Sequence, residues 1–190
     1  MIQISLPLVV AGLFTLGTSL PAQETMTMND VTLPTRVEVE GQSLVLNGMA
    51  LRKKAIFKVY VAGLYLPQKS SNADAILSAD GPRRILLQFL RSVSANQMCD
   101  ALNDGLKDNT PSAPAELRQK FATMCGFFEE IKKGEQFVFT YLPGRGTTVE
   151  VKGARKGTIE GKEFADALFR AWIGLRPGPG EDFKRKLLGG

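Results

Sequence analysis

The chain has 190 residues, a formal net charge of +5 at pH 7, two cysteines and no histidine. Without histidine it can form neither a Ser-His-Asp triad, nor a Cys-His dyad, nor a His-ligated metal site, and two cysteines alone cannot build a structural zinc site. Any acid–base chemistry would therefore rest on tyrosine, lysine, arginine, carboxylates or bound water.

The N-terminal residues predict export. Leu6 to Leu16 is an apolar run of the length of a signal-peptide core, and the small and turn residues Leu20-Pro21-Ala22 follow it. We expect a signal peptide over residues 1–22, cleavage after Ala22, and a periplasmic or secreted protein. The alternative interpretation is a buried N-terminal helix. Residues 23–190 are then one domain, large enough to bury its own core.

The basic residues are predicted to be solvated surface. Nucleic-acid binding is disfavoured because of the export signal and because aromatic and basic residues do not interleave. Weak attraction to an anionic membrane surface is a second interpretation. The basic clusters are Arg52-Lys53-Lys54, Arg83-Arg84, Arg155-Lys156 and Lys184-Arg185-Lys186.

Short strands over 35–40 and 43–46 are followed by a long apolar strand, Asn47 to Leu66, with a basic cluster at its start. Counting by twos places Arg52 and Tyr60 on one face of that strand. Eight residues of straight strand would separate their Cα atoms by about 26 Å. The basic pair Lys53-Lys54 is awkward inside a covered sheet, so we expect the chain to turn or bulge near residues 53–55 and to bring Arg52 back toward Tyr60.

The rest of the chain predicts an α+β domain, an antiparallel sheet with helices packed on it. Asp166 and Glu163 are expected on the exposed face of the late helix. The predicted elements are helices over 71–78, 94–107, 114–131, 162–173 and 181–188 and strands over 83–90, 137–142, 147–152 and 154–160.

The two cysteines, Cys99 and Cys125, lie on the apolar stripes of two predicted helices. In an oxidising compartment they would form a disulfide if those helices are neighbours. The alternative is two buried thiols that act as small hydrophobic side chains.

Four segments, in order along the chain, resemble the chalcone isomerase-like superfamily in its bacterial, exported branch. The resemblance covers about residues 31–189 and implies a large antiparallel sheet, helices on one side of it and a cleft between them. The segments are Asn47 to Leu66 (NGMALRKKAIFKVYVAGLYL), 134–153 (GEQFVFTYLPGRGTTVEVKG), 161–177 (GKEFADALFRAWIGLRP) and 186–189 (KLLG).

The resemblance also implies site residues. In plant chalcone isomerases, which need no metal or organic cofactor, an arginine polarises the substrate ketone, and Arg52 matches that arginine. Tyr60 stands where those enzymes carry threonine and where fatty-acid-binding relatives carry tyrosine, and Asn103 matches a helix asparagine. The enzymes' Ser/Thr-Met pair is replaced by Ala171-Trp172, and their helix tyrosine and lysine have no counterpart in Ser94–Cys99.

We therefore expect a protein that binds a small amphipathic acid, such as a fatty acid, through Arg52, Tyr60, Asn103 and Trp172, with no cofactor and no metal. A guanidinium and a tyrosine hydroxyl at one end of an apolar cleft suffice to hold a carboxylate. The alternative is a cofactor-independent isomerase of the intramolecular lyase type that acts on a conjugated carbonyl compound other than chalcone, with Arg52 and Tyr60 as catalytic groups. A structural or partner-binding role is a third interpretation. Arg52 could instead be a strand-edge charge, and Tyr60 and Trp172 could be core residues.

Overall fold

The computed structural model describes residues 23–190, so the predicted signal peptide and its cleavage site lie outside the described residues. Its centre is a seven-stranded antiparallel sheet whose strands follow one another in chain order. The strands are β3 (Arg36–Val39), β4 (Gln42–Lys54), β5 (Phe57–Leu66), β6 (Arg83–Phe89), β7 (Gln136–Leu142), β8 (Gly146–Val151) and β9 (Ala154–Ile159).

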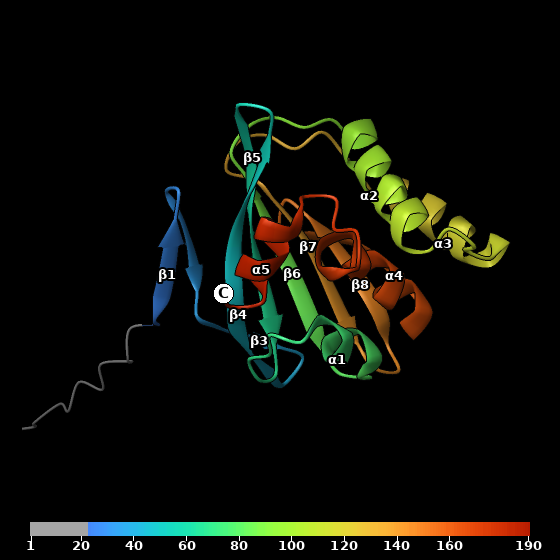
Figure 1. Cartoon of the computed structure of the whole chain (residues 1–190), viewed down its shortest axis with the longest axis horizontal. Coiled ribbons are helices and arrows are strands. Elements are labelled where there is room, and N and C mark those ends of the chain that lie inside the picture. The colour runs from blue at the N-terminus through green and yellow to red at the C-terminus, as the bar shows by residue number, and fades with distance from the viewer. Residues whose placement is uncertain (1–22) are drawn as a thin grey trace, which may run out of the picture.

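All described helices lie on one side of this sheet, as Figure 1 shows, and the α+β class is confirmed. The main core fills the space between the sheet and the helices, and α4 contributes the most to it because eight of its twelve residues are buried. The helices are α1 (Ala73–Ser78), α2 (Ala95–Asn109), α3 (Ala115–Cys125), α4 (Lys162–Ile173) and α5 (Glu181–Leu187).

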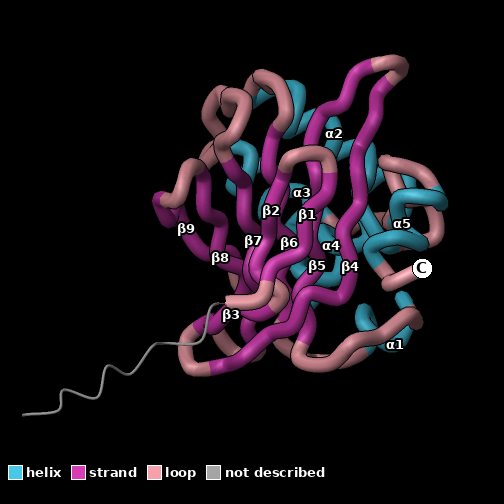
Figure 2. The backbone as a smooth tube through the Cα atoms, turned by 90° about the vertical axis from the view of Figure 1, so that its left-hand side faces the viewer, coloured by secondary structure: helices cyan, strands magenta, loops and turns pink. Residues whose placement is uncertain are grey.

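The opposite face of the sheet is covered by a separate hairpin of β1 (Thr25–Met28) and β2 (Val31–Pro34), which Figure 2 shows in front of the sheet. Its buried side chains Val31 and Leu33 belong to a second, smaller core on that face. The sequence did not predict these strands, although Asn29 and Asp30 both have positive φ, as a tight hairpin turn requires, and this residue pair favours such a turn.

The predicted single strand over Asn47 to Leu66 is wrong, because this segment forms two strands. β4 and β5 form an antiparallel hairpin that turns at Ala55 and Ile56, where Ala55 adopts a φ of 51°. Arg52 is paired directly with Tyr60, and the register shifts between Arg52 and Lys53. The predicted return of Arg52 toward Tyr60 is therefore confirmed, through a turn together with an irregularity in the ladder.

The apolar pattern predicts nine core residues, of which Phe57 is 52% exposed at the end of this hairpin and Val59 is only partly buried. The other seven are buried: Val61, Phe89, Phe121, Phe128, Phe139, Phe164 and Leu168. The helix predicted over 114–131 ends at Cys125. Ile131 instead pairs with Val93 in an isolated β-bridge. Both Phe128 and Ile131 remain buried, so the apolar stripe continues beyond the helix.

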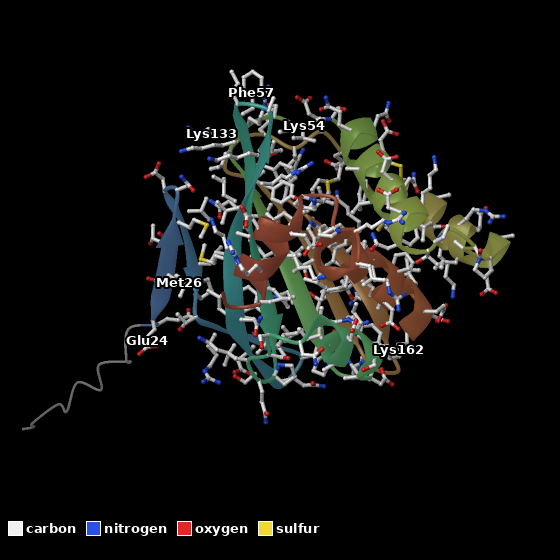
Figure 3. The ribbon with its side chains drawn as sticks, in the orientation of Figure 1. Glu24, Met26, Lys54, Phe57, Lys133 and Lys162 are labelled. Atoms are coloured by element: carbon white, nitrogen blue, oxygen red, sulfur yellow. A yellow bond between two sulfur atoms is a disulfide. The ribbon has the colours of Figure 1, made fainter. Side chains whose placement is uncertain are left out.

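Cys99 of α2 and Cys125 at the end of α3 form a disulfide, with Cα atoms 5.3 Å apart. Figure 3 shows the yellow sulfur atoms near α2. Of the two interpretations that the sequence left open, the bridged one holds. The bridge ties together two helices that are consecutive in the chain and otherwise share few contacts with each other.

Gly48 allows α5 to lie directly on β4. A Cβ atom at this position would come within 2.1 Å of the Lys186 carbonyl oxygen and 2.7 Å of that of Leu187. The neighbouring Asn47 side chain donates to the Leu187 carbonyl at 2.7 Å, and its own oxygen accepts from the Ser70 amide at 2.7 Å. The C-terminal helix is thus held to the sheet by backbone contact as well as by side-chain packing.

We expect Gly48→Ala to lower the free energy of unfolding by about 1–3 kcal/mol, because either β4 or α5 must move to admit the methyl group. Urea denaturation measures the change. Gly81→Ala is the matched control, since nothing lies within 4 Å of its added Cβ. Equal stability of the two variants would show that α5 is not held closely against the strand.

Candidate functional site

A cavity of about 570 Å³ lies between the β4–β5 hairpin and the end of β6 on one side and α2 and the end of α4 on the other. Its volume is in the usual range for sites that hold small molecules. Three of the four predicted binding residues, Arg52, Tyr60 and Trp172, line it. They come from β4, β5 and α4, so the site exists only once hairpin and helix are packed together.

Tyr60 is the buried polar group of this cavity. Its hydroxyl accepts a hydrogen bond from the indole Nε1 of Trp172 at 3.1 Å. Because an indole can only donate, the phenolic proton is left to donate elsewhere, and no described residue accepts it. Burial raises the pKa of Tyr60 to about 12, against the opposing effects of the Trp172 hydrogen bond and the Arg52 charge. Tyr60 therefore remains a neutral donor throughout the physiological pH range.

Arg52 supplies the positive charge beside that donor. It faces Tyr60 across the β4–β5 pair, and side chains of directly paired residues project from the same face of a sheet. Arg52 is partly buried and forms no salt bridge with any described carboxylate. A guanidinium and a hydroxyl that have no acceptor in the described part of the chain thus lie side by side, and together they can bind a carboxylate or a carbonyl oxygen.

The neighbouring wall is apolar. The Phe89 ring lies 5.5 Å from the Tyr60 ring, and Met98, Leu102 and Ala171 continue the surface from α2 and α4. Gly105 allows α2 to lie close to α4, since a Cβ atom at this position would lie 2.8 Å from the Cβ of Ala171. The position of these residues beside the cavity follows only from the fold.

The outer wall of the cavity carries carboxylates that the sequence did not single out. Asp100, Asp104 and Asp108 recur every fourth residue along α2, and all three line the cavity. They are exposed, and none forms a salt bridge with a described residue. The α2 wall is thus negative and the hairpin wall positive, which favours an anionic ligand group on the hairpin side.

Asn103 lies elsewhere than the resemblance implies. It is exposed and is not among the residues that line the cavity. Its amide donates to the sulfur of Cys99 at 3.3 Å and lies 3.9 Å from the sulfur of Cys125. The structure therefore places Asn103 beside the disulfide.

Two other features are absent from the described residues. Within residues 23–190, no group of three or more cysteine or carboxylate side chains is placed to hold a metal ion. None of the helices found there has the length and apolar character needed to cross a membrane.

Comparisons with known proteins agree with this architecture. The profile of a family described as chalcone isomerase-like matches residues 25–189. A crystal structure of an Arabidopsis thaliana fatty-acid binding protein, AtFAP1, has the same fold, with a TM-score of 0.70 and 19% identity over 87% of this chain and 96% of the other. No curated protein matches the chain. Because the profile spans nearly all of the described residues, the chain belongs to the chalcone isomerase-like family.

Proposed function

We propose that this protein binds a small amphipathic acid, of which a long-chain fatty acid is the simplest example. The observation that carries the proposal is the pair formed by Arg52 and the Tyr60 hydroxyl, next to an apolar wall in a cavity of about 570 Å³. Neither group donates to an acceptor among residues 23–190. The carboxylate would accept from Tyr60 and pair with Arg52, and the hydrocarbon chain would lie against Phe89, Met98 and Leu102. A protein of the same fold that is named for fatty-acid binding supports this ligand class.

The aspartate row favours a second candidate, a cofactor-independent isomerase of the intramolecular lyase type. Carboxylates across the cavity from Arg52 could accept a proton while Arg52 polarises a carbonyl group. The aspartates are exposed, however, and the buried polar group is a neutral donor. This arrangement suits the holding of an oxygen better than the removal of a proton.

Native mass spectrometry of the purified protein, with extraction of the bound compound, tests the proposal first. We expect an amphipathic acid that is recovered unchanged after incubation with fresh protein. Conversion of the recovered compound to an isomer would favour the second candidate. A titration with the fatty acid and with its methyl ester then separates recognition of the carboxylate from recognition of the chain.

We expect Arg52→Ala to weaken fatty-acid binding by about 1.5–3 kcal/mol, the usual worth of a hydrogen bond to a charged group. Tyr60→Phe should weaken binding by about 0.5–1.5 kcal/mol, because the carboxylate loses a neutral donor. Calorimetric titration measures both. Lys58→Ala is the control, since Lys58 is an exposed cation of β5 outside the cavity. Unchanged affinity in both site variants would mean that the carboxylate binds elsewhere.

Export is part of the proposal. The apolar run from Leu6 to Leu16 and the residues up to Ala22 support it, and a disulfide is typical of proteins that mature in an oxidising compartment. N-terminal sequencing of protein from a cell-envelope fraction should begin at Gln23. An intact Met1 on cytoplasmic protein would contradict export.

A further inference from the structure

The end of the β4–β5 hairpin carries two adjacent exposed apolar side chains. Ile56 is 87% exposed and Phe57 is 52% exposed, and among the described residues only two other large apolar side chains, Met26 and Leu175, are comparably exposed. Figures 1 and 2 show that this hairpin extends beyond the rest of the sheet. We call residues 52–58 the hairpin tip. Its apolar residues are thus presented at a projecting point of the molecule.

The hairpin tip is also strongly basic. Arg52, Lys53, Lys54 and Lys58 lie within seven residues, and the sequence contains no acidic residue between Gly41 and Ala73. None of these four cations forms a salt bridge with a described residue. The hairpin tip itself therefore carries four positive charges and no negative one.

A further cation comes from outside the hairpin. The guanidinium carbon of Arg91, which follows β6, lies 4.4 Å from the centre of the Phe57 ring. In Figure 3, Lys133 is labelled at the same end of the molecule as Lys54 and Phe57. Positively charged side chains thus flank the exposed apolar residues Ile56 and Phe57.

We propose that the hairpin tip docks on an anionic lipid surface, with Ile56 and Phe57 entering the headgroup region and the lysines contacting the anionic headgroups. Charge complementarity and an apolar point ringed by cations are the features that interfacial anchors share. A convex tip of this size fits a fluid layer. A specific protein partner would need a matching pocket and about 800 Å² of surface on each side.

The hairpin tip lies at the edge of the cavity, so docking of the tip would also place the cavity near the lipid surface. Lys54 and Phe57 of the hairpin tip line the cavity, and so does Arg91 beside them. A docked protein would therefore have its cavity opening close to the bilayer, where an amphipathic molecule could pass between them. The docking itself rests on the tip alone and does not require the proposed function.

Flotation with vesicles tests the docking on the full chain after signal removal. We expect binding to vesicles of equal parts phosphatidylcholine and phosphatidylglycerol, and little binding to phosphatidylcholine alone. Lys53→Gln with Lys58→Gln should reduce the affinity about 30-fold, since each lysine near an anionic surface is worth about fivefold. The matched control is Lys69→Gln with Lys107→Gln, which removes the same charge from exposed positions elsewhere.

Insertion of the apolar point is tested separately. Ile56→Ser should reduce vesicle affinity about tenfold, whereas Leu175→Ser, at an apolar residue 85% exposed, should not. In Ile56→Trp, the new indole fluorescence should shift to the blue on vesicles and be quenched by brominated lipid, while the buried Trp172 gives a constant background.

Absence of binding to the anionic vesicles, or equal binding by the tip and control variants, would overturn the inference. A charge effect without any effect of Ile56→Ser and without quenching would overturn the insertion. Neither Ile56 nor Lys53 nor Lys58 lines the cavity. Their variants should therefore keep the fatty-acid affinity of the unaltered protein in vesicle-free titrations, which distinguishes failure of docking from failure of ligand binding.

Discussion

Replacing Arg83 with alanine is expected to lower the free energy of unfolding by about 3–5 kcal/mol, the cost of breaking a buried ion pair from one side. Arg83 begins β6 and is 1% exposed. Its guanidinium forms a salt bridge with Asp166 of α4 and donates to the Ile76 carbonyl of α1 at 3.0 Å. Removal would leave Asp166 with only Lys162, which contacts its other oxygen at 2.7 Å.

Packing adds to this cost. The Arg83 guanidinium carbon lies 4.9 Å from the centre of the Tyr141 ring and 5.1 Å from that of Phe169, so truncation also opens a cavity between β7 and α4. Arg83→Lys should recover only part of the loss, because lysine lacks the planar fork.

Chemical denaturation of Arg83→Ala and of a control, Arg145→Ala, gives the measurement. Arg145 also pairs with a carboxylate, that of Glu40, but its side chain is 69% exposed, so its removal should cost at most about 1 kcal/mol. A loss of similar size in the two variants would mean that Arg83 does not connect the helices to the sheet.

Phe121→Ala should cost about 3–5 kcal/mol, the usual range for emptying a phenylalanine site in a core. Phe121 is 1% exposed, and its ring meets that of Phe164 edge to face at 5.2 Å, which joins α3 to α4. Gln119→Ala, at an exposed position of the same helix, should stay within about 0.5 kcal/mol of the unaltered protein. A loss below about 1 kcal/mol for Phe121→Ala would show that this helix face is not packed.

For Arg83, the alternation of residues along the strand predicts burial correctly, whereas its charge suggested an exposed position. The pair Arg83-Arg84 was expected to be solvated, and Asp166 was expected on the exposed face of its helix, yet Arg83 and Asp166 form a largely buried ion pair. Side chains alternate between the two faces of β6, and Arg83 lies on the same face as Ile85, Leu87 and Phe89, all of which are buried. This alternation indicates that Arg83 is buried too. The pairing itself could not be predicted, since it depends on how α4 crosses the sheet.

From α1 onward, the order of strands and helices was predictable because each element carries its own periodicity. The β4–β5 turn was less visible because Ala55 and Ile56 are not turn residues, and Ala55 takes a left-handed conformation without glycine or asparagine. The site needed that turn, since it sets Arg52 against Tyr60. Strand geometry and the Lys53-Lys54 pair predicted that Arg52 returns toward Tyr60 near residues 53–55, and the structure places the turn at Ala55 and Ile56.

The remaining parts of the cavity depend on tertiary packing. The four-residue spacing of Asp100, Asp104 and Asp108 could be read from the sequence, but not that this face of α2 borders the cavity. The ligand-binding role of Asn103 was implied only by the family resemblance. In the structure its side chain contacts the Cys99–Cys125 disulfide.

The proposed function requires that a carboxylate binds between Arg52 and Tyr60. A crystal structure of the protein with a saturated long-chain fatty acid tests it most directly. We expect a carboxylate oxygen within hydrogen-bond distance of the Tyr60 hydroxyl and the Arg52 guanidinium at the same carboxylate. The hydrocarbon chain should lie along Phe89, Met98 and Leu102. A fatty acid bound outside this cavity, or one whose carboxylate points away from both residues, would contradict it.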